Sequence, residues 1–177
     1  PMNTEAENRF RYIDAYQNTD VVQTKFTNKL KEDIILKSPG HPDRFSYLID
    51  DEWLDSQIDS EGNLHLYPLG TDMSQTRFLI PPPYLIDANG EKSATSDVTM
   101  TFENSTLTLV PNPAWLEKHP YPIILDPTVE ITVLNVNSVP TVGGPWEVRF
   151  TTIGRGTLTI AGDPDNTVYG VNVEPVS

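Results

Sequence analysis

The chain has 177 residues, enough for one ordinary domain with a hydrophobic core, or for one domain and part of a second. Its 25 acidic and 12 basic residues leave a net charge of −13, which would repel nucleic acid and anionic membranes. No apolar run approaches the roughly 20 residues of a membrane-spanning helix, and the absence of cysteine excludes disulfides and thiolate metal sites. We therefore predict no nucleic-acid partner and no membrane insertion.

The residue types predict an all-β protein. The sequence holds 19 Thr, 14 Val and 12 Ile against only 6 Ala, so β-branched residues dominate while the best helix former is scarce. Its 16 Pro are spread along the whole chain, and each Pro inside a helix costs about 3 kcal/mol. Long helices are therefore not expected, and the predicted fold is an antiparallel β-sandwich.

Short β-like runs recur between turn residues along most of the chain. Residues 98–103 and 106–110 alternate apolar and polar side chains on either side of Asn104 and Ser105, which predicts a hairpin. The predicted strands are 9–14, 21–27, 31–37, 45–49, 64–67, 77–80, 84–87, 98–103 and 106–110.

Two short helical turns are also predicted. Residues 50–54 begin with acidic side chains, which suit the positive end of a helix. Residues 113–118 have Asn112 as a cap and Pro113 at the first helical position, and Pro120 ends the turn. The core residues predicted in this region are Trp115, Leu116 and Tyr121.

Three parts of the chain are expected. Residues 1–7 are predicted to be an expression remnant or linker, 8–130 a β-sandwich module, and 131–177 a second small or truncated β-unit. The last part has roughly 45 residues, near the size at which a separate core becomes doubtful. It is therefore either a truncated module or a unit packed on the first.

Two segments carry a resemblance to a known type of module. One is the strand pattern K-E-x-I-x-L that begins at Lys31, and the other is W-L-x4-Y-P-[IV]-x2-D-P-T, which begins at Trp115 and contains Asp126. They resemble a module of large bacterial cell-surface and secreted proteins that often precedes RHS or YD-type repeats or other adhesive regions. The resemblance covers roughly residues 8–130, and it implies a β-rich architecture and an extracellular location. It implies no catalytic residues.

The sequence carries no motif of a known enzyme class, so no catalytic residue is predicted. His41 and His119 precede prolines in turns, and His65 alternates with leucines in a strand, so all three are expected to have structural or surface roles. A glycan-binding module would need grouped exposed aromatic side chains. The available tyrosines are Tyr12, Tyr16, Tyr47, Tyr67 and Tyr84.

The expected cofactor is none, with calcium as the alternative. Hard oxygen ligands clustered in one loop are what calcium selects, and the segment 50–63 holds several carboxylates without the register of an EF-hand. The candidate ligands are Asp50, Asp51, Asp55, Asp59 and Glu61. A solvated acidic loop is the plainer interpretation.

Lys31 and Asp126 are the most informative charged residues. Both are flanked by apolar strand residues, and a charge in such a place is rarely buried without a partner. They are predicted to form a buried ion pair, or to be two unrelated groups. The alternative is a Lys-to-Asp isopeptide cross-link with Glu32 or Glu130 as the proton-transferring acid.

The residue patterns predict a non-catalytic β module, and the resemblance implies that it is a structural or adhesive part of a large bacterial surface protein. Its expected partners are the neighbouring domains of the same chain and a possible glycan or protein ligand at the cell surface. The alternatives are a glycan- or protein-binding module and a self-cross-linking or self-processing domain.

Overall fold

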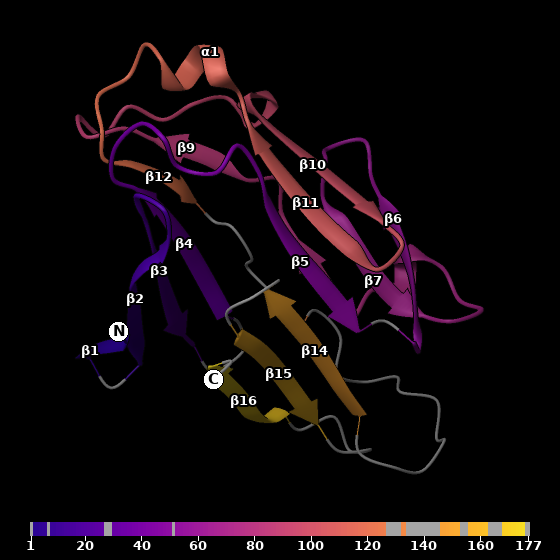
Figure 1. Ribbon diagram of the computed structural model, residues 1–177. Helices are drawn as coiled ribbons and strands as arrows, with labels where there is room; N and C mark the ends of the chain where they lie inside the picture. The colour runs from indigo at the N-terminus through magenta and orange to yellow at the C-terminus, as the bar shows by residue number, and fades with distance from the viewer. Residues whose placement is uncertain are drawn as a thin grey trace.

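The computed structural model describes residues 2–6, 8–26, 30–50, 52–126, 132–133, 146–152, 156–162 and 168–175. These residues form three sheets of antiparallel strands with only short helical turns between them (Figure 1), so the predicted all-β class is confirmed. Over the described ranges, none of the helices has the length and apolar character that crossing a membrane would require.

The first sheet has six strands: four follow one another at the start of the chain, and two come from later segments. In spatial order they are β1 (Met2–Ala6), β2 (Arg9–Tyr16), β3 (Thr19–Lys25), β4 (Leu30–Leu36), β12 (Ile123–Asp126) and β9 (Tyr84–Ile86). Strand β1 occupies most of the segment that was predicted to be a remnant or linker, and it pairs with β2. With only five residues, this strand is too short for the alternation of its side chains to stand out in the sequence.

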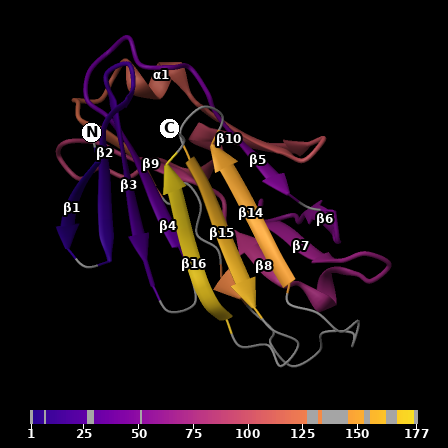
Figure 2. The same cartoon turned by 60° about the horizontal axis from the view of Figure 1, so that its bottom comes forward.

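The second sheet contains the predicted hairpin and the C-terminal strands. In spatial order its strands are β10 (Val98–Glu103), β11 (Thr106–Pro111), β5 (Phe45–Asp50), β14 (Trp146–Thr152), β15 (Gly156–Gly162) and β16 (Val168–Pro175). The hairpin is confirmed: Asn104 and Ser105 have φ values of 49° and 61°, the left-handed conformation that a tight turn needs. Strand β14 pairs with β5, so strands β14, β15 and β16 share a sheet with β5, β10 and β11 of the preceding region (Figure 2).

The third sheet and the helical turns complete the described chain. The sheet has the order β13 (Thr132–Val133), β8 (Phe78–Ile80), β7 (Leu64–Pro68) and β6 (Leu54–Ile58). The helical turns are η1 (Met73–Gln75), η2 (Thr95–Asp97) and α1 (Pro113–Leu116).

One of the two predicted helical turns is correct. Asn112 caps α1 by accepting a hydrogen bond from the N–H of Ala114, with Pro113 at the first helical position. The prediction over 50–54 is wrong, since β5 continues to Asp50 and β6 begins at Leu54. Glu52 and Trp53 form a turn before β6 begins.

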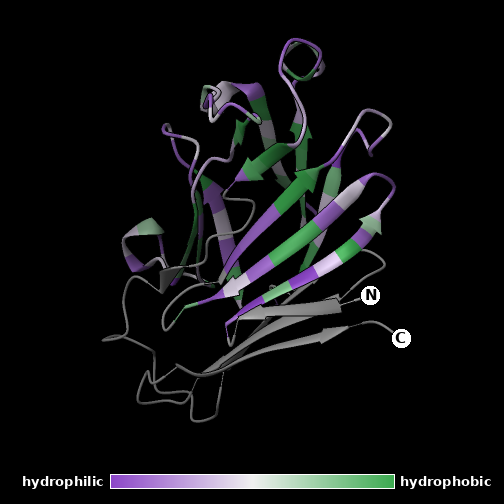
Figure 3. Cartoon of the chain, turned by 90° about the vertical axis from the view of Figure 1, so that its left-hand side faces the viewer, coloured by the Kyte–Doolittle hydropathy of each residue, from purple (hydrophilic) through white to green (hydrophobic). Residues whose placement is uncertain are grey.

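The hydrophobic core gathers side chains from all three sheets. In β4 and β12 the alternation of strand side chains places Ile34, Leu36, Ile123 and Leu125 inside, each at most 1% exposed. Figure 3 shows hydrophobic and hydrophilic residues in alternating bands along the strands. The remaining members of the core cluster are Ala15, Val21, Phe45, Tyr47, Ile49, Leu64, Leu66, Phe78, Ile80, Leu85, Val98, Leu107 and Leu109.

The three core residues predicted near α1 lie at the edge of this core. Trp115, Leu116 and Tyr121 are half-buried and pack against the buried cluster from outside. The helical turn and the loop after it cover one end of the sheets (Figure 1), so their large side chains close the core without entering it.

Replacing Leu125 by Ala should lower the free energy of unfolding by about 2–5 kcal/mol, because the change leaves a cavity among fully buried side chains. Leu69, which is 53% exposed, is the matched control, and Leu69→Ala should change stability by less than about 0.5 kcal/mol. Urea unfolding of both variants provides the measurement. Equal losses for the two variants would contradict this placement of the core.

Candidate functional site

The pairing of β4 with β12 brings the two predicted charged residues together. Leu125 pairs with Ile34 in antiparallel register. Asp126, the residue after Leu125, therefore lies next to Asp33, the residue before Ile34. Asp126 also pairs with Tyr84 of β9. Lys31 precedes Asp33 by two positions and therefore shares its face of the sheet. We call Lys31, Asp33, Tyr84 and Asp126 the Lys31 cluster.

The side chains of this cluster are in direct contact. The Nζ atom of Lys31 lies 2.5 Å from Asp126 Oδ1 and 3.0 Å from Asp33 Oδ1. The hydroxyl of Tyr84 donates a hydrogen bond of 3.1 Å to Asp126 Oδ2. The Lys31 side chain is 28% exposed, whereas those of Asp33 and Asp126 are 16% and 9% exposed. One ammonium thus joins two nearly buried carboxyl groups at the surface of the sheet.

The two carboxyl groups have opposite pKa shifts. Burial, followed by the hydrogen bond with Asp126, raises the pKa of Asp33 to about 6, although Lys31 opposes this change. Burial also acts to raise the pKa of Asp126, but hydrogen bonds with Asp33 and Lys31 outweigh it and hold that pKa below its usual value. The pair therefore retains a proton more readily than two isolated carboxyl groups, with the negative charge concentrated on Asp126.

Lys31 responds to the same neighbours. Burial acts to lower the pKa of its ammonium group, but the hydrogen bonds with Asp126 and Asp33 outweigh burial and raise it. Lys31 therefore remains charged at neutral pH. The electrostatics favour the ion-pair interpretation over a neutral amine that could attack a carboxyl group.

Glu32, one of the two acids proposed for proton transfer, does not belong to this cluster. Adjacent residues of a strand point to opposite faces, and Glu32 lies in the core, where it accepts hydrogen bonds from Tyr47 OH at 2.7 Å and Gln23 Nε2 at 2.6 Å. Burial raises its pKa. The acid beside Lys31 is Asp33, which the same alternation in the sequence would have identified. The second acid, Glu130, lies outside the described residues.

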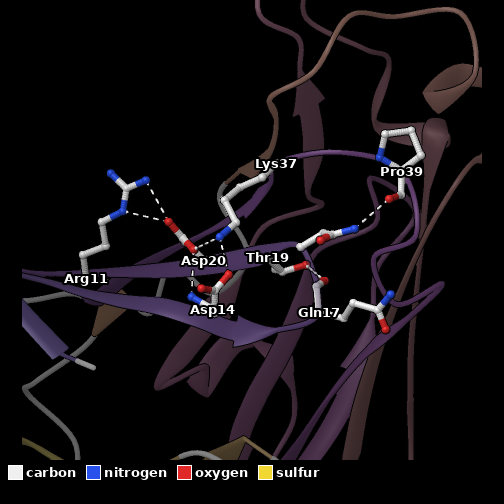
Figure 4. Close-up of polar contacts among 8 residues, drawn as sticks. Arg11, Asp14, Gln17, Thr19, Asp20, Lys37 and Pro39 are labelled. Atoms are coloured by element: carbon white, nitrogen blue, oxygen red, sulfur yellow. Dashed lines mark hydrogen bonds and ion pairs between the residues drawn. The ribbon is translucent and has the colours of Figure 1, made fainter.

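A second charge cluster lies on the first sheet at β2, β3 and the end of β4 (Figure 4). Asp20 is 3% exposed and accepts hydrogen bonds from Arg11 Nη2 at 2.8 Å and from the N–H of Asp14 at 2.9 Å. Lys37 Nζ lies 2.9 Å from Asp20 and also contacts Asp14. Burial acts to raise the pKa of Asp20, but the Asp14 N–H, Lys37 and Arg11 hold it below its usual value.

The loop proposed for calcium is organised around Asp59. The two oxygens of Asp59 accept hydrogen bonds from the N–H groups of Glu61 and Asn63, from Asn63 Nδ2 and from His65 Nε2. Asp55 accepts one from the N–H of Gly70. The side chain of Asp50 and the whole of Asp51 lie outside the described part of the chain. Both oxygens of Asp59 thus already accept hydrogen bonds from neighbouring protein groups. Calcium binding by this loop stays a prediction.

His65 is partly exposed between the buried Leu64 and Leu66, as strand alternation predicts, but its ring is hydrogen-bonded on both sides. Its Nδ1 lies 2.9 Å from Thr76 Oγ1 and its Nε2 lies 2.9 Å from Asp59 Oδ2. The ring is held between a helical turn and the acidic loop. These partners come from separate segments, so the alternation within β7 alone could not reveal them.

The tyrosines considered for glycan binding do not form one exposed group. Tyr47 and Tyr67 are buried, and Tyr12 and Tyr16 pack against the core. Tyr84 is half-buried and belongs to the Lys31 cluster, where Lys92 Nζ lies 3.3 Å from the centre of its ring. These side chains support internal packing.

No protein-family model, curated protein or solved structure matches this chain.

The stability of the Asp33→Asn variant relative to the wild type should increase as the pH rises from about 4 to about 6. Folded Asp33 keeps its proton up to about pH 6, whereas in the unfolded chain it releases the proton near its ordinary value of 3.8. The native wild type therefore loses stability over this interval, and the variant does not. The difference should grow by about 1 kcal/mol or more, measured by urea unfolding at several pH values.

The matched control is Asp43, an exposed aspartate beside Arg44. The hydrogen bond from Arg44 lowers the pKa of Asp43, so Asp43→Asn should show no gain over the same interval. A pH-independent difference between wild type and Asp33→Asn would show that Asp33 titrates normally and would contradict the proton-sharing arrangement.

Proposed function

We propose that the protein is a non-catalytic structural module of a large bacterial cell-surface or secreted protein, acting as a spacer or platform between neighbouring domains. The observation that carries this proposal is the Lys31 cluster, which joins β4, β12 and β9 across the outer face of a sheet. The cell-surface location is supported by the sequence resemblance over roughly 8–130. The excess of acidic residues favours solubility in such an exposed setting.

A structural module has to keep strands together that are far apart in sequence. Strands β4 and β12 meet through only three register pairs, and the ion pair of Lys31 with Asp126 adds a link at the end of this short ladder. The second charge cluster, formed by Arg11, Asp14, Asp20 and Lys37, links β2, β3 and the end of β4 in a similar way. Charge-assisted contacts of this kind, with one partner almost buried, hold more firmly than exposed ion pairs.

A self-cross-linking module is the second candidate, favoured by the 2.5 Å separation of Lys31 Nζ and Asp126 Oδ1. In that reaction the neutral amine of Lys31 attacks Cγ of protonated Asp126. The C–N bond forms, the C–O bond breaks and one water leaves, while Asp33 takes the proton from the amine and returns it to the departing hydroxyl. The reaction requires uncharged partners, whereas the contacts favour charged Lys31 and Asp126. The ion pair is therefore the leading interpretation.

Removing either charge of the pair should weaken the module. We expect Lys31→Met and Asp126→Asn each to lower the free energy of unfolding and the force needed to unfold the chain from its ends. Because Lys31 is partly exposed, the coupling energy in a double-mutant cycle should be about 1–2 kcal/mol, below that of a fully buried pair. Chemical unfolding and single-molecule pulling give the two measurements.

The exposed pair of Asp43 and Arg44 is the control, because side-chain exposures of 78% and 63% leave little net interaction. Its cycle should give a coupling energy near zero. If the Lys31 variants unfold at the wild-type force and with additive losses of stability, the cluster has no mechanical role, and the structural proposal loses its main support.

An intact-mass spectrum distinguishes the two candidates. We expect the wild-type chain to have its full sequence mass, as an ion pair requires. A wild-type mass lower by one water, with the full sequence mass in both Lys31→Met and Asp126→Ala, would establish the cross-link instead. Asp33→Asn would then be expected to retain the water, because the proton-transferring acid is missing.

A further inference from the structure

Three potential metal ligands meet at the end of the sheets that α1 covers. Asp87 and Glu91 belong to the loop after β9, and His119 follows α1. One ligand atom from each of the three lies within 4.8 Å of the other two. The backbone N–H of Ala88 donates to the carbonyl of Pro120 at 3.1 Å, which fixes the two loops against each other. We call Asp87, Glu91 and His119 the His119 site.

Asp87 is held rigidly and has one unused oxygen. Its residue is 5% exposed, and Oδ1 accepts hydrogen bonds of 2.8 Å from the N–H groups of both Asn89 and Glu91. Gly90, with φ of +83°, permits the tight turn that supplies these donors. The other oxygen, Oδ2, is buried and has no hydrogen-bond partner. A buried carboxylate oxygen without a partner is costly, and a bound cation would remove that cost.

His119 is oriented as metal-binding histidines usually are. Its Nδ1 lies 2.7 Å from the carbonyl oxygen of Trp115, so an N–H at this position donates to the backbone and leaves the Nε2 lone pair free. The indole of Trp115 stacks on the imidazole at 3.7 Å with an angle of 9° between the rings, which fixes the ring plane. Nε2 lies 3.4 Å from Glu91 Oε1.

We propose that Asp87, Glu91 and His119 bind a divalent transition metal ion, with Zn²⁺ as the best match. The donor set is one imidazole nitrogen and two carboxylate oxygens. Imidazole favours zinc over calcium, and three protein ligands leave a fourth position for water. Donor atoms in a tetrahedral zinc site with bonds of about 2.0 Å lie roughly 3.3 Å apart. Glu91, whose side chain is 66% exposed, can move to close the remaining distance.

Such an ion would connect the loop after β9 to the segment after α1. The sequence alone does not reveal this site, because its ligands lie in two segments and have no recognisable spacing. In the sequence, His119 has the pattern of a turn residue before Pro120. The fold brings the ligands together because the loop with Asp87 and Glu91 follows β9, whereas His119 shortly precedes β12, and β9 and β12 are neighbours in the first sheet. The site is separate from the Lys31 cluster, so it can be tested independently of the proposed structural function.

The test is a zinc titration of the full 177-residue chain without an affinity tag, followed by calorimetry and native mass spectrometry. Calcium in excess is present throughout, so that weak binding of cations to the acidic surface is saturated. We expect one zinc per chain and a rise in Tm on zinc addition. Glu91→Gln and His119→Gln should each weaken zinc binding by about tenfold or more.

The matched control is Glu117→Gln, which changes an exposed carboxylate near the site that is not one of its ligands. This variant should bind zinc as the wild type does. Melting curves in chelator verify that each variant is folded. Glu91→Gln is the variant that should disturb folding least, because the Glu91 side chain is exposed and the backbone N–H of this residue can still donate to Asp87.

Absence of saturable zinc binding in excess calcium would overturn the proposal and leave His119 and Glu91 as an ordinary ion pair. Equal zinc affinity in wild type, Glu91→Gln and His119→Gln would also overturn it, because the metal would then bind elsewhere. A site that calcium fills in preference to zinc would contradict the assignment of an imidazole ligand.

Discussion

Strands β4 and β12 lie side by side although most of the described chain separates them in sequence, and both the core and the Lys31 cluster depend on this pairing. The pairing places Ile34 and Leu125 on the inner face and Asp33 and Asp126 on the outer face. Burial of the inner side chains drives the association through the hydrophobic effect. The same register then fixes the distance between the outer carboxyl groups. The charged cluster is thus positioned by the apolar face behind it.

The protein holds its partly buried carboxyl groups in three different ways. Asp20 is almost enclosed but receives two cationic side chains and a backbone N–H, so its charge is compensated. Asp33 and Asp126 share one lysine, and burial together with the hydrogen bond to Asp126 raises the pKa of Asp33 although Lys31 opposes the change. Glu32 has only the uncharged donors of Tyr47 and Gln23, and burial raises its pKa. Burial acts to raise the pKa of each of these carboxyl groups, and the hydrogen bonds and charges around it decide whether its pKa ends above or below the usual value.

Several contacts join the loops at the end of the sheets near α1. The hydrogen bond between Ala88 and Pro120, the turn around Asp87 and the stack of Trp115 on His119 all lie in this region. Trp115 is half-buried because one face of its indole covers His119 while the residue packs against the core. Its role in closing the core and its role in orienting the imidazole are compatible, since they use different parts of the side chain.

The sequence by itself determined the all-β class, most strand positions, the hairpin turn at Asn104 and the Asn112 cap, because alternation, turn residues and capping are local properties of the chain. It also indicated that Lys31 and Asp126 need partners, since charges in apolar strands are costly. Only the tertiary structure decided that they contact each other and that Asp33 is the third member. Strand register, sheet order and the meeting of separate loops depend on contacts between distant segments, which no local pattern encodes.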